Sequence, residues 1–221
     1  MTEPIRYAVL KDKQRAIRDD FPETMALRVH RAISWIGRAE ACNDDADARF
    51  IFLWIAFNAA YADEREFQSI PQGERAAFLD YFGRLVALDH EKRIYRAVWQ
   101  KFSGPVRLLM ENHYVFNPFW QHHNGMDGYA DWHDRFRGSA KSFGLAFQNG
   151  DTARVLSYVF DRLYVLRNQI VHGGSTWNSQ VNRAQVTDGA AILSFLMPVF
   201  VDLMMDNPRA DWGKPFYPVV K

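Results

Sequence analysis

Three polar side chains close together in the chain could cleave a phosphodiester bond. They are Arg167, Asn168 and His172. The unperturbed pKa of an imidazole is about 6.5, so a histidine can take up a proton near neutral pH. A guanidinium can contact two phosphate oxygens at once, which an ammonium group cannot copy. Because RNA carries its own nucleophile, the 2′-hydroxyl, a base and a cation would suffice for cleavage without a metal ion.

The segment 152–172 has the pattern of the helix that must position these residues. Its apolar residues recur at helical spacing and form one stripe, consisting of Leu156, Val159, Leu163, Leu166 and Ile170. Gly173 follows directly, and glycine suits the left-handed residue that commonly ends a helix. We therefore expect all three polar residues in the last turns of this helix.

The helical geometry separates the cation from the imidazole. Asn168 and His172 are four residues apart and share a face, whereas Arg167 lies about 140° from His172 around the axis. Two copies of the helix packed together could bring the two groups into a shared cleft. The structural alternative is that cations near a helix C-terminus interact favourably with its dipole, by about 0.3–1 kcal/mol. On the spacing alone, the structural explanation is favoured.

Three stretches carry a resemblance to a known superfamily. The string from Arg167 to His172 resembles the HEPN motif, in which arginine and a polar residue precede a few variable residues and a histidine. Residues 50–61, with Asn58 embedded, are similar to the buried helix of several stand-alone HEPN families. Residues 182–189 give a weaker resemblance at the start of the next helix. The resemblance covers roughly residues 25–205. Its middle part, about 64–150, resembles no particular HEPN subfamily, so the subfamily stays open.

The resemblance implies both an activity and an assembly. HEPN domains are all-helical, pair through their motif helices, and include many metal-independent RNases of toxin–antitoxin, abortive-infection and CRISPR systems. The implied function is a toxin or phage-defence endoribonuclease that cuts single-stranded RNA without a cofactor, with Arg167, Asn168 and His172 as catalytic residues. RNA, a second copy and a neutralising antitoxin are the implied partners. A non-catalytic HEPN module that binds RNA or a partner protein, and a purely structural dimer, are the alternatives.

Hydrophobic periodicity predicts an all-α bundle of about seven helices in a single domain, residues 1–221. A loop-rich insertion is expected over about 103–150 and an irregular tail over 207–221. The expected helices cover 4–19, 22–42, 46–63, 74–102 with a break near Asp89, 105–112, 129–148, 152–172 and 177–206, the last kinked at Pro198. A polar connection is expected over 64–73.

Composition narrows the class of protein. The 221 residues are 48% hydrophobic and 15% aromatic, which is enough for a real core. The net charge of +1 excludes wholesale packaging of nucleic acid but allows a local basic patch. Cys42 is the only cysteine, so no disulfide framework can form. No signal pattern opens the chain and its longest apolar run is too short to span a bilayer, so a cytoplasmic protein without membrane contact is expected.

Several further residues are candidates for supporting the site or binding RNA. Asn58 lies in an apolar helix, where it either bridges core helices or reaches toward the motif helix to support Arg167 or His172. Arg93, Arg96 and Lys101 are interleaved with the aromatic residues Tyr95 and Trp99, a pattern that suits single-stranded RNA but also any amphipathic helix. Arg183 is counted with these cations as an RNA contact. Arg28, Arg31 and Arg38 are expected on a solvated face, with RNA contact as the alternative.

Imidazole and carboxylate side chains gather in an aromatic segment near the middle of the chain. They are His122, His123, Asp127, Asp131 and His133, which are suitable ligands for zinc or manganese. Their spacing fits no standard metal pattern, so no metal site is expected. A long loop that covers the active cleft is the favoured interpretation of this segment.

The motif helix is apolar on more than one side. Phe160, Tyr164 and Val171 widen the stripe, and Val165 lies opposite it. This surplus of apolar surface predicts that a second chain packs against the helix, in addition to the core of its own chain. We therefore expect a two-fold dimer in which the two His172 side chains face a common groove.

Overall fold

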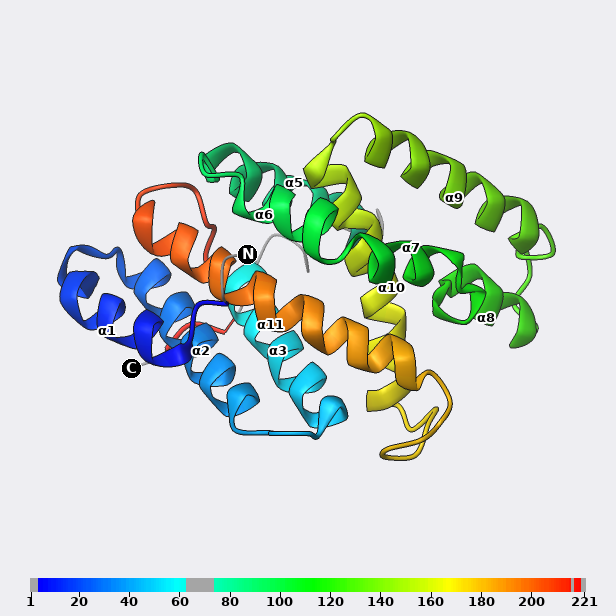
Figure 1. Ribbon diagram of the computed structural model, residues 1–221, viewed down its shortest axis with the longest axis horizontal. Helices are drawn as coiled ribbons and strands as arrows, with labels where there is room; N and C mark the ends of the chain where they lie inside the picture. The colour runs from blue at the N-terminus through cyan, green and yellow to red at the C-terminus, as the bar shows by residue number, and fades with distance from the viewer. Residues whose placement is uncertain (1–3, 63–73, 216, 220–221) are drawn as a thin grey trace.

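The chain folds into a bundle of α-helices without a β-strand in the part that the structure describes. The structure, a computed structural model, describes residues 4–62, 74–215 and 217–219, and the polar connection predicted over 64–73 lies outside them (Figure 1). The ten α-helices of these residues are α1 (Tyr7–Ile17), α2 (Glu23–Glu40), α3 (Ala46–Tyr61), α5 (Glu74–Leu88), α6 (Arg93–Arg96), α7 (Ser103–Glu111), α8 (Asn117–His123), α9 (Trp132–Gln148), α10 (Thr152–Val171) and α11 (Arg183–Asp206).

Side chains cap two helices, α3 and α10, at the positions where the sequence predicts these helices to begin. The Asp45 carboxylate accepts a hydrogen bond from the backbone N–H of Ala48 at 2.9 Å and so opens α3. The Asp151 carboxylate accepts one from Arg154 at 3.1 Å and opens α10, the motif helix. Each cap satisfies a backbone donor that the helix itself leaves without a partner. The predicted starts of these two helices, at residues 46 and 152, are therefore confirmed.

One core joins the helices that carry the candidate site. α10 packs against α5, α3 and α9, and α11 lies against α2 and α3. At the centre is a cluster of buried aromatic rings, including Phe57, Phe82, Phe160 and Phe200. Gly189 lets α11 approach closely, because a Cβ there would lie 2.9 Å from the Phe50 ring and 3.0 Å from Leu163. The motif helix is thus held by side chains from several elements.

The middle of the chain is more regular than the sequence predicts. The break at Asp89 is present, because α5 ends at Leu88 and α6 begins only at Arg93. The Asp89 carboxylate accepts a hydrogen bond from the backbone N–H of Ile94, in the first turn of α6, at 2.7 Å. The helix then continues as a π-turn over Ala97–Lys101. Helix α8 forms inside the predicted irregular segment, around a small separate core of Phe116, Phe119 and Trp132. The expected count of about seven helices is therefore too low.

The segment after the motif helix was wrongly predicted to be helical from 177. Residues 173–182 form turns, and α11 begins only at Arg183. Asn178 and Asn182 have positive φ angles of 54° and 57°, which asparagine tolerates better than most residues. Helix α11 then continues through Pro198 to Asp206.

Helix α11 also passes a length and composition test for a membrane span. It is the one described helix of at least 18 residues whose mean hydropathy, 1.6, is high enough. Of that apolar window, 78% is buried inside the bundle. Its apolar residues, among them Leu193, Leu196 and Phe200, thus pack in the core of the chain.

Arg28 was wrongly placed on a solvated face. Its side chain is fully buried, and its guanidinium donates to the backbone carbonyl oxygens of Ala60 at 3.1 Å and Lys214 at 2.9 Å. The cation therefore ties the C-terminal tail to the end of α3. Arg31, one turn later on α2, donates to the carbonyl oxygen of Tyr217 at 2.7 Å and continues this attachment.

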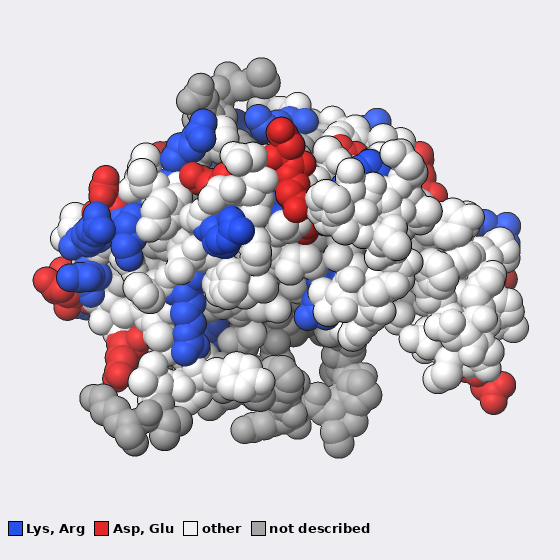
Figure 2. All heavy atoms as spheres, turned by 90° about the horizontal axis from the view of Figure 1, so that it is seen from below, with Lys and Arg blue, Asp and Glu red and all other residues white. Residues whose placement is uncertain are grey.

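Charged side chains of both signs share the surface. On the face seen from below in Figure 2, lysine and arginine are interspersed with aspartate and glutamate rather than segregated. This distribution agrees with the net charge of +1. Any contact with an anionic ligand must therefore depend on a few placed cations.

Candidate functional site

The motif helix ends at the residue that the sequence predicts. Val171 is its last residue, and Gly173 follows with a φ of 73°. The backbone N–H of Gly174 donates to the carbonyl oxygen of Gln169 at 2.6 Å, and that of Gly173 to Ile170 at 3.3 Å. This pair of bonds is the Schellman arrangement, which satisfies the last carbonyl groups of a helix. It leaves His172 as the C-cap residue, exposed to solvent.

Asn168 orients the guanidinium of Arg167. The Arg167 Nη1 group donates to the Asn168 side-chain oxygen at 2.7 Å, and the guanidinium carbon lies 5.6 Å from the centre of the Tyr164 ring. Asn168 shares a face with His172, which made its amide a candidate to hold that imidazole, but its described side-chain contact is with Arg167 instead. Adjacent residues in a helix point in directions about 100° apart, so a bond between them needs the long Arg167 side chain to fold back.

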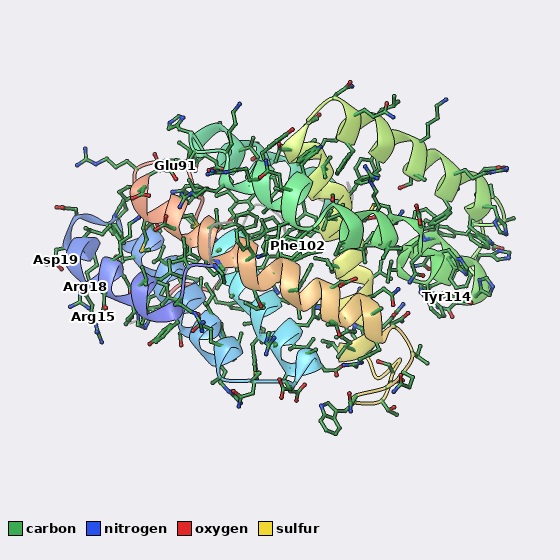
Figure 3. The ribbon with its side chains drawn as sticks, in the orientation of Figure 1. Arg15, Arg18, Asp19, Glu91, Phe102 and Tyr114 are labelled. Carbon is green, nitrogen blue, oxygen red and sulfur yellow. The ribbon has the colours of Figure 1, made fainter. Side chains whose placement is uncertain are left out.

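Gln169, which the sequence analysis passed over, fixes the surroundings of the motif. Its side-chain N–H donates to the carbonyl oxygen of Tyr114 at 2.6 Å, and its side-chain oxygen accepts from Asn182 at 2.7 Å. It therefore joins α10 both to the turn before α8, where Figure 3 labels Tyr114, and to the turn before α11. The sequence signal that could have identified Gln169 is its place as a polar residue in the last turn of the helix, between Asn168 and His172.

A cleft opens beside Arg167. It has a volume of about 400 Å³ and lies between α2, α3, α5, α10 and the C-terminal tail. Arginine, asparagine and aromatic side chains dominate its walls. The described lining residues are Arg31, Trp35, Trp54, Ile55, Asn58, Ala59, Tyr61, Ala62, Phe78, Tyr164, Arg167, Pro215 and Tyr217.

The cleft brings together two of the predicted site residues and leaves out a third. Asn58 and Arg167 both line it, from α3 and α10. Asn58 is half-buried and makes no side-chain hydrogen bond within the described residues, so the bridging core amide considered as its structural role is not found. His172 is not among the lining residues, in agreement with the angular separation expected from the helix.

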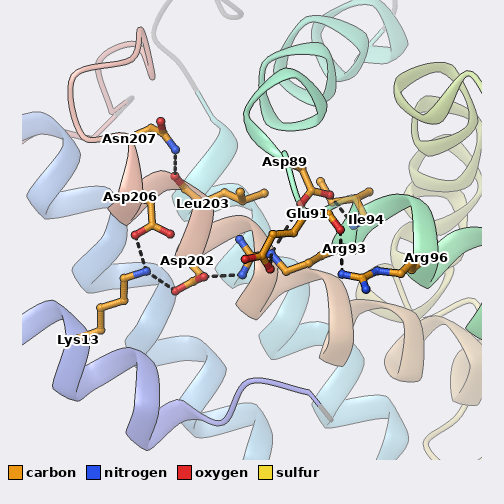
Figure 4. A network of polar contacts seen from close by, with 10 residues as sticks. All are labelled: Lys13, Asp89, Glu91, Arg93, Ile94, Arg96, Asp202, Leu203, Asp206 and Asn207. Carbon is orange, nitrogen blue, oxygen red and sulfur yellow. Dashed lines mark hydrogen bonds and ion pairs between the residues drawn. The ribbon is translucent and has the colours of Figure 1, made fainter. Parts of the chain in front are cut away.

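Two of the cations predicted to bind RNA have partners inside the chain. Arg93 contacts Asp202 at 2.6 Å and Asp89 at 3.6 Å, within the polar network of Figure 4. Arg183 contacts both carboxylate oxygens of Asp47 at 2.8 Å. An RNA phosphate would have to displace these carboxylates, so the ion pairs disfavour RNA binding by Arg93 and Arg183. The contacts of these two residues with RNA stay predictions.

The other two predicted cations are exposed. Arg96 donates to the carbonyl oxygen of Glu91 at 2.8 Å, and the Lys101 ammonium lies 5.2 Å from the centre of the Phe195 ring. Both side chains keep hydrogen-bond donors for another partner. Their contact with RNA stays a prediction.

The aromatic residues between these cations are already stacked. The ring centres of Tyr95 and Trp99 lie 4.5 Å apart, and those of Trp99 and Phe147 lie 4.8 Å apart. The Arg107 guanidinium lies 5.2 Å from the centre of the Phe147 ring. Trp99 thus has a ring on each side and no free face for an RNA base. The stacking that the sequence suggested for it is replaced by packing within the chain.

The histidine-rich segment forms aromatic packing. His133 stacks on Trp132 with ring centres 3.5 Å apart, and His123 hydrogen-bonds the carbonyl oxygen of Phe119 at 2.8 Å. Asp131 pairs with Arg135 at 2.8 Å. Across residues 4–62, 74–215 and 217–219, no group of three or more histidine, cysteine, aspartate or glutamate side chains is placed to hold a metal ion.

The apolar surplus of the motif helix is used inside the chain. Phe160 is fully buried and Val165 is 5% exposed, so the core covers more than one side of α10. Of the residues named for the surplus, only Val171 is largely exposed, at 53%. The argument from surplus apolar surface to a dimer is therefore wrong. The remaining argument for the dimer that the resemblance implies is the separation of Arg167 from His172 around the helix.

Comparisons with protein-family models, with curated proteins and with solved structures found no match to this chain. A functional assignment therefore depends on the residues and their arrangement.

Proposed function

We propose that this chain is a metal-independent endoribonuclease of the HEPN type that cleaves single-stranded RNA. The observation that carries the proposal is the end of α10. There the Arg167 guanidinium is held by Asn168 at 2.7 Å beside a cleft, and the His172 imidazole is exposed at the C-cap one turn further on. A held cation next to an accessible base is the pair that RNA cleavage through the 2′-hydroxyl requires.

The proposed reaction uses groups of the protein and the RNA only. The neutral imidazole of His172 takes the proton of a 2′-hydroxyl, and the 2′-oxygen attacks the adjacent phosphorus. The bond to the 5′-oxygen breaks, and that oxygen leaves as a hydroxyl with the proton that the His172 imidazolium returns, so the imidazole is neutral again. Arg167 contacts the phosphate oxygens, where negative charge accumulates in the transition state. The products are a 2′,3′-cyclic phosphate and a 5′-hydroxyl end.

Two copies are part of the proposal. Five residues of helix turn Arg167 and His172 about 140° apart, which directs the cation and the base to different sides of α10. A two-fold pairing at the last turn of α10 would let the base of one copy meet the cation of the other. Light scattering at micromolar concentration should therefore give the mass of a dimer, and a stable monomer would contradict this part.

Cleavage of a labelled single-stranded RNA in the presence of EDTA tests the activity. His172→Ala and Arg167→Ala should each slow cleavage by about a hundredfold or more, the usual size of a general-base or charge contribution. Arg167→Lys should not restore the rate, because an ammonium cannot make the two-pronged contact. The single-stranded DNA of the same sequence, which lacks the 2′-hydroxyl, should stay intact.

The matched control is Arg15→Gln, which removes an exposed arginine of α1 that pairs only with the neighbouring Asp12 among its described contacts. It should cleave RNA at the wild-type rate. Cleavage that EDTA abolishes, or that survives both alanine substitutions, would place the active site elsewhere. Binding of RNA without cleavage by the wild-type protein would instead favour a non-catalytic RNA-binding module.

A further inference from the structure

The cleft beside Arg167 has a charge and an aromatic content that favour one class of ligand. Its described lining residues include two arginines, Arg31 and Arg167, and no carboxylate. Six of them are aromatic, namely Trp35, Trp54, Tyr61, Phe78, Tyr164 and Tyr217. A ligand that combines a negative charge with a flat ring system would satisfy both features.

The aromatic rings divide into a buried floor and accessible walls. Trp54, at 3% exposure, packs behind Tyr164, and the centres of the two rings lie 6.1 Å apart. Trp35 is half-buried and is supported from behind by Phe52, whose ring centre lies 5.6 Å away in a stacked arrangement. Tyr164 is likewise half-buried. Trp35 is therefore a partly exposed ring that Phe52 holds in place, whereas the Tyr164 ring already contacts Trp54 and lies 5.6 Å from the Arg167 guanidinium.

Polar groups in the cleft keep hydrogen-bonding capacity. The Asn58 amide has no side-chain hydrogen bond within the described residues and can offer both a donor and an acceptor. Arg31 makes one bond to Tyr217, and a guanidinium has five N–H donors. Arg167 likewise has donors beyond the one directed at Asn168.

We infer that the cleft binds one nucleotide of the RNA substrate and that Asn58 selects its base. The base lies against Trp35, and the phosphate is held by Arg31 and Arg167. The volume of about 400 Å³ is near the lower end of the roughly 300–1,000 Å³ of small-ligand sites, so it suits one nucleotide rather than a duplex. This inference builds on the proposed function, because it assigns the nucleotide next to the phosphate that is cut.

The amide of Asn58 predicts which base is preferred. An asparagine amide matches the N6 and N7 edge of adenine with one acceptor and one donor. An aspartate can only accept, and it pairs with the N4 amino group of cytosine. The wild-type cleft should therefore prefer adenosine monophosphate, and Asn58→Asp should shift the preference toward cytidine monophosphate.

Isothermal titration of the full chain with AMP, GMP, CMP and UMP tests this directly, without any requirement for catalysis. AMP should bind at least about fivefold more tightly than the other three, the lower end of what one well-placed base contact gives. Trp35→Ala should weaken AMP binding by about fivefold or more through lost stacking. In Asn58→Ala the affinities for the four nucleotides should lie within twofold of one another. In Asn58→Asp the affinity for CMP should be the highest of the four. Thermal unfolding of each variant shows that it is folded.

Two further proteins separate this inference from the proposed activity. His172→Ala lies outside the cleft and should bind AMP as the wild type does although it no longer cuts RNA. Arg15→Gln, at the opposite end of the molecule from Tyr114 in Figure 3, should leave AMP binding unchanged. AMP binding by a protein that cuts no RNA would support the cleft and refute the RNase.

Three results would overturn the assignment. The first is the absence of AMP binding at millimolar concentration. The second is equal affinity for the four nucleotides in the wild type, with no change in either Asn58 variant. The third is RNA cleavage by the wild type that Trp35→Ala and Asn58→Asp leave unchanged in rate and in sequence preference. That third result would retain the RNase and place its base contact elsewhere.

Discussion

Asp202 is the carboxylate on which a nearly buried polar network depends (Figure 4). Its two oxygens accept hydrogen bonds from Lys13 on α1 and Arg93 on α6, each at 2.6 Å. The side chains of Asp202 and Arg93 are only 13% and 19% exposed. The network therefore joins three helices distant in sequence, and Asp202→Asn removes the charge with almost no change in shape.

The loss can be estimated from these contacts. A hydrogen bond to a charged group contributes about 1.5–3 kcal/mol, and asparagine retains one acceptor oxygen of the two. Arg93 would keep Asp89 at 3.6 Å as a partner, which limits the cost of leaving its charge in place. We expect Asp202→Asn to lower the free energy of unfolding by about 2–4 kcal/mol. At roughly 3 °C per kcal/mol for a chain of this length, Tm should fall by about 9 °C.

Asp206→Asn supplies a matched control on the same helix. Asp206 also contacts Lys13, at 2.7 Å, but its side chain is 50% exposed. An exposed pair of this kind contributes about 0–1 kcal/mol. Urea denaturation of both variants can be followed by tryptophan fluorescence. If Asp202→Asn costs no more than Asp206→Asn, the assignment of Asp202 as the centre of the network is wrong.

The effect should also depend on pH in one direction. Burial raises the pKa of the Asp202 carboxyl, but the hydrogen bonds from Arg93 and Lys13 outweigh it and hold the pKa below the ordinary 3.8. A lowered folded-state pKa gives stability that is present above the unfolded pKa and is lost as the pH falls through the folded pKa. The difference between wild type and Asp202→Asn should thus be full at pH 7 and shrink below about pH 4.

Two other substitutions test the remaining structural claims. Asn168→Ala should lower RNA cleavage by about tenfold or more with little change in Tm, because it frees the Arg167 guanidinium from its position; a wild-type rate would contradict the orienting role. Arg28→Met should lower the free energy of unfolding by about 3–5 kcal/mol in urea denaturation, since buried carbonyl groups lose their donor. Arg38→Met, an exposed arginine of the same helix, should change it by about 1 kcal/mol at most.

Much of the helical architecture follows from patterns visible in the sequence. The stripe of the motif helix predicts α10 almost to the residue, and Asp45 and Asp151 mark two helix starts correctly. These features are local, because a cap or an apolar stripe is decided within a few residues. Gly173 belongs to the same class, since its positive φ depends on the end of one helix only.

The errors concern properties that depend on distant contacts. Arg28 shares the polar face pattern of Arg31 and Arg38, but it is buried among groups distant in the chain, including Ala60 at the end of α3 and Lys214 in the C-terminal tail. Phe160 and Val165 indicated surplus apolar surface, because the sequence does not show how many neighbours surround α10. The cleft combines residues from α2, α3, α5, α10 and the tail, and no single stretch of sequence contains it.

The burial along α10 explains why chemistry is available at one end of this helix. From Val155 to Leu166 most side chains are buried, Arg167 to Ile170 are half-buried, and Val171 onward is exposed. A helix enclosed on most sides can present polar groups to a ligand only where its neighbours end. That position also fixes how far apart the groups lie, with Arg167 still at the cleft wall and His172 already in solvent. The same geometry that makes the cation and the base accessible thus sends them to different surfaces, and the proposed second copy is what would bring them to one phosphate.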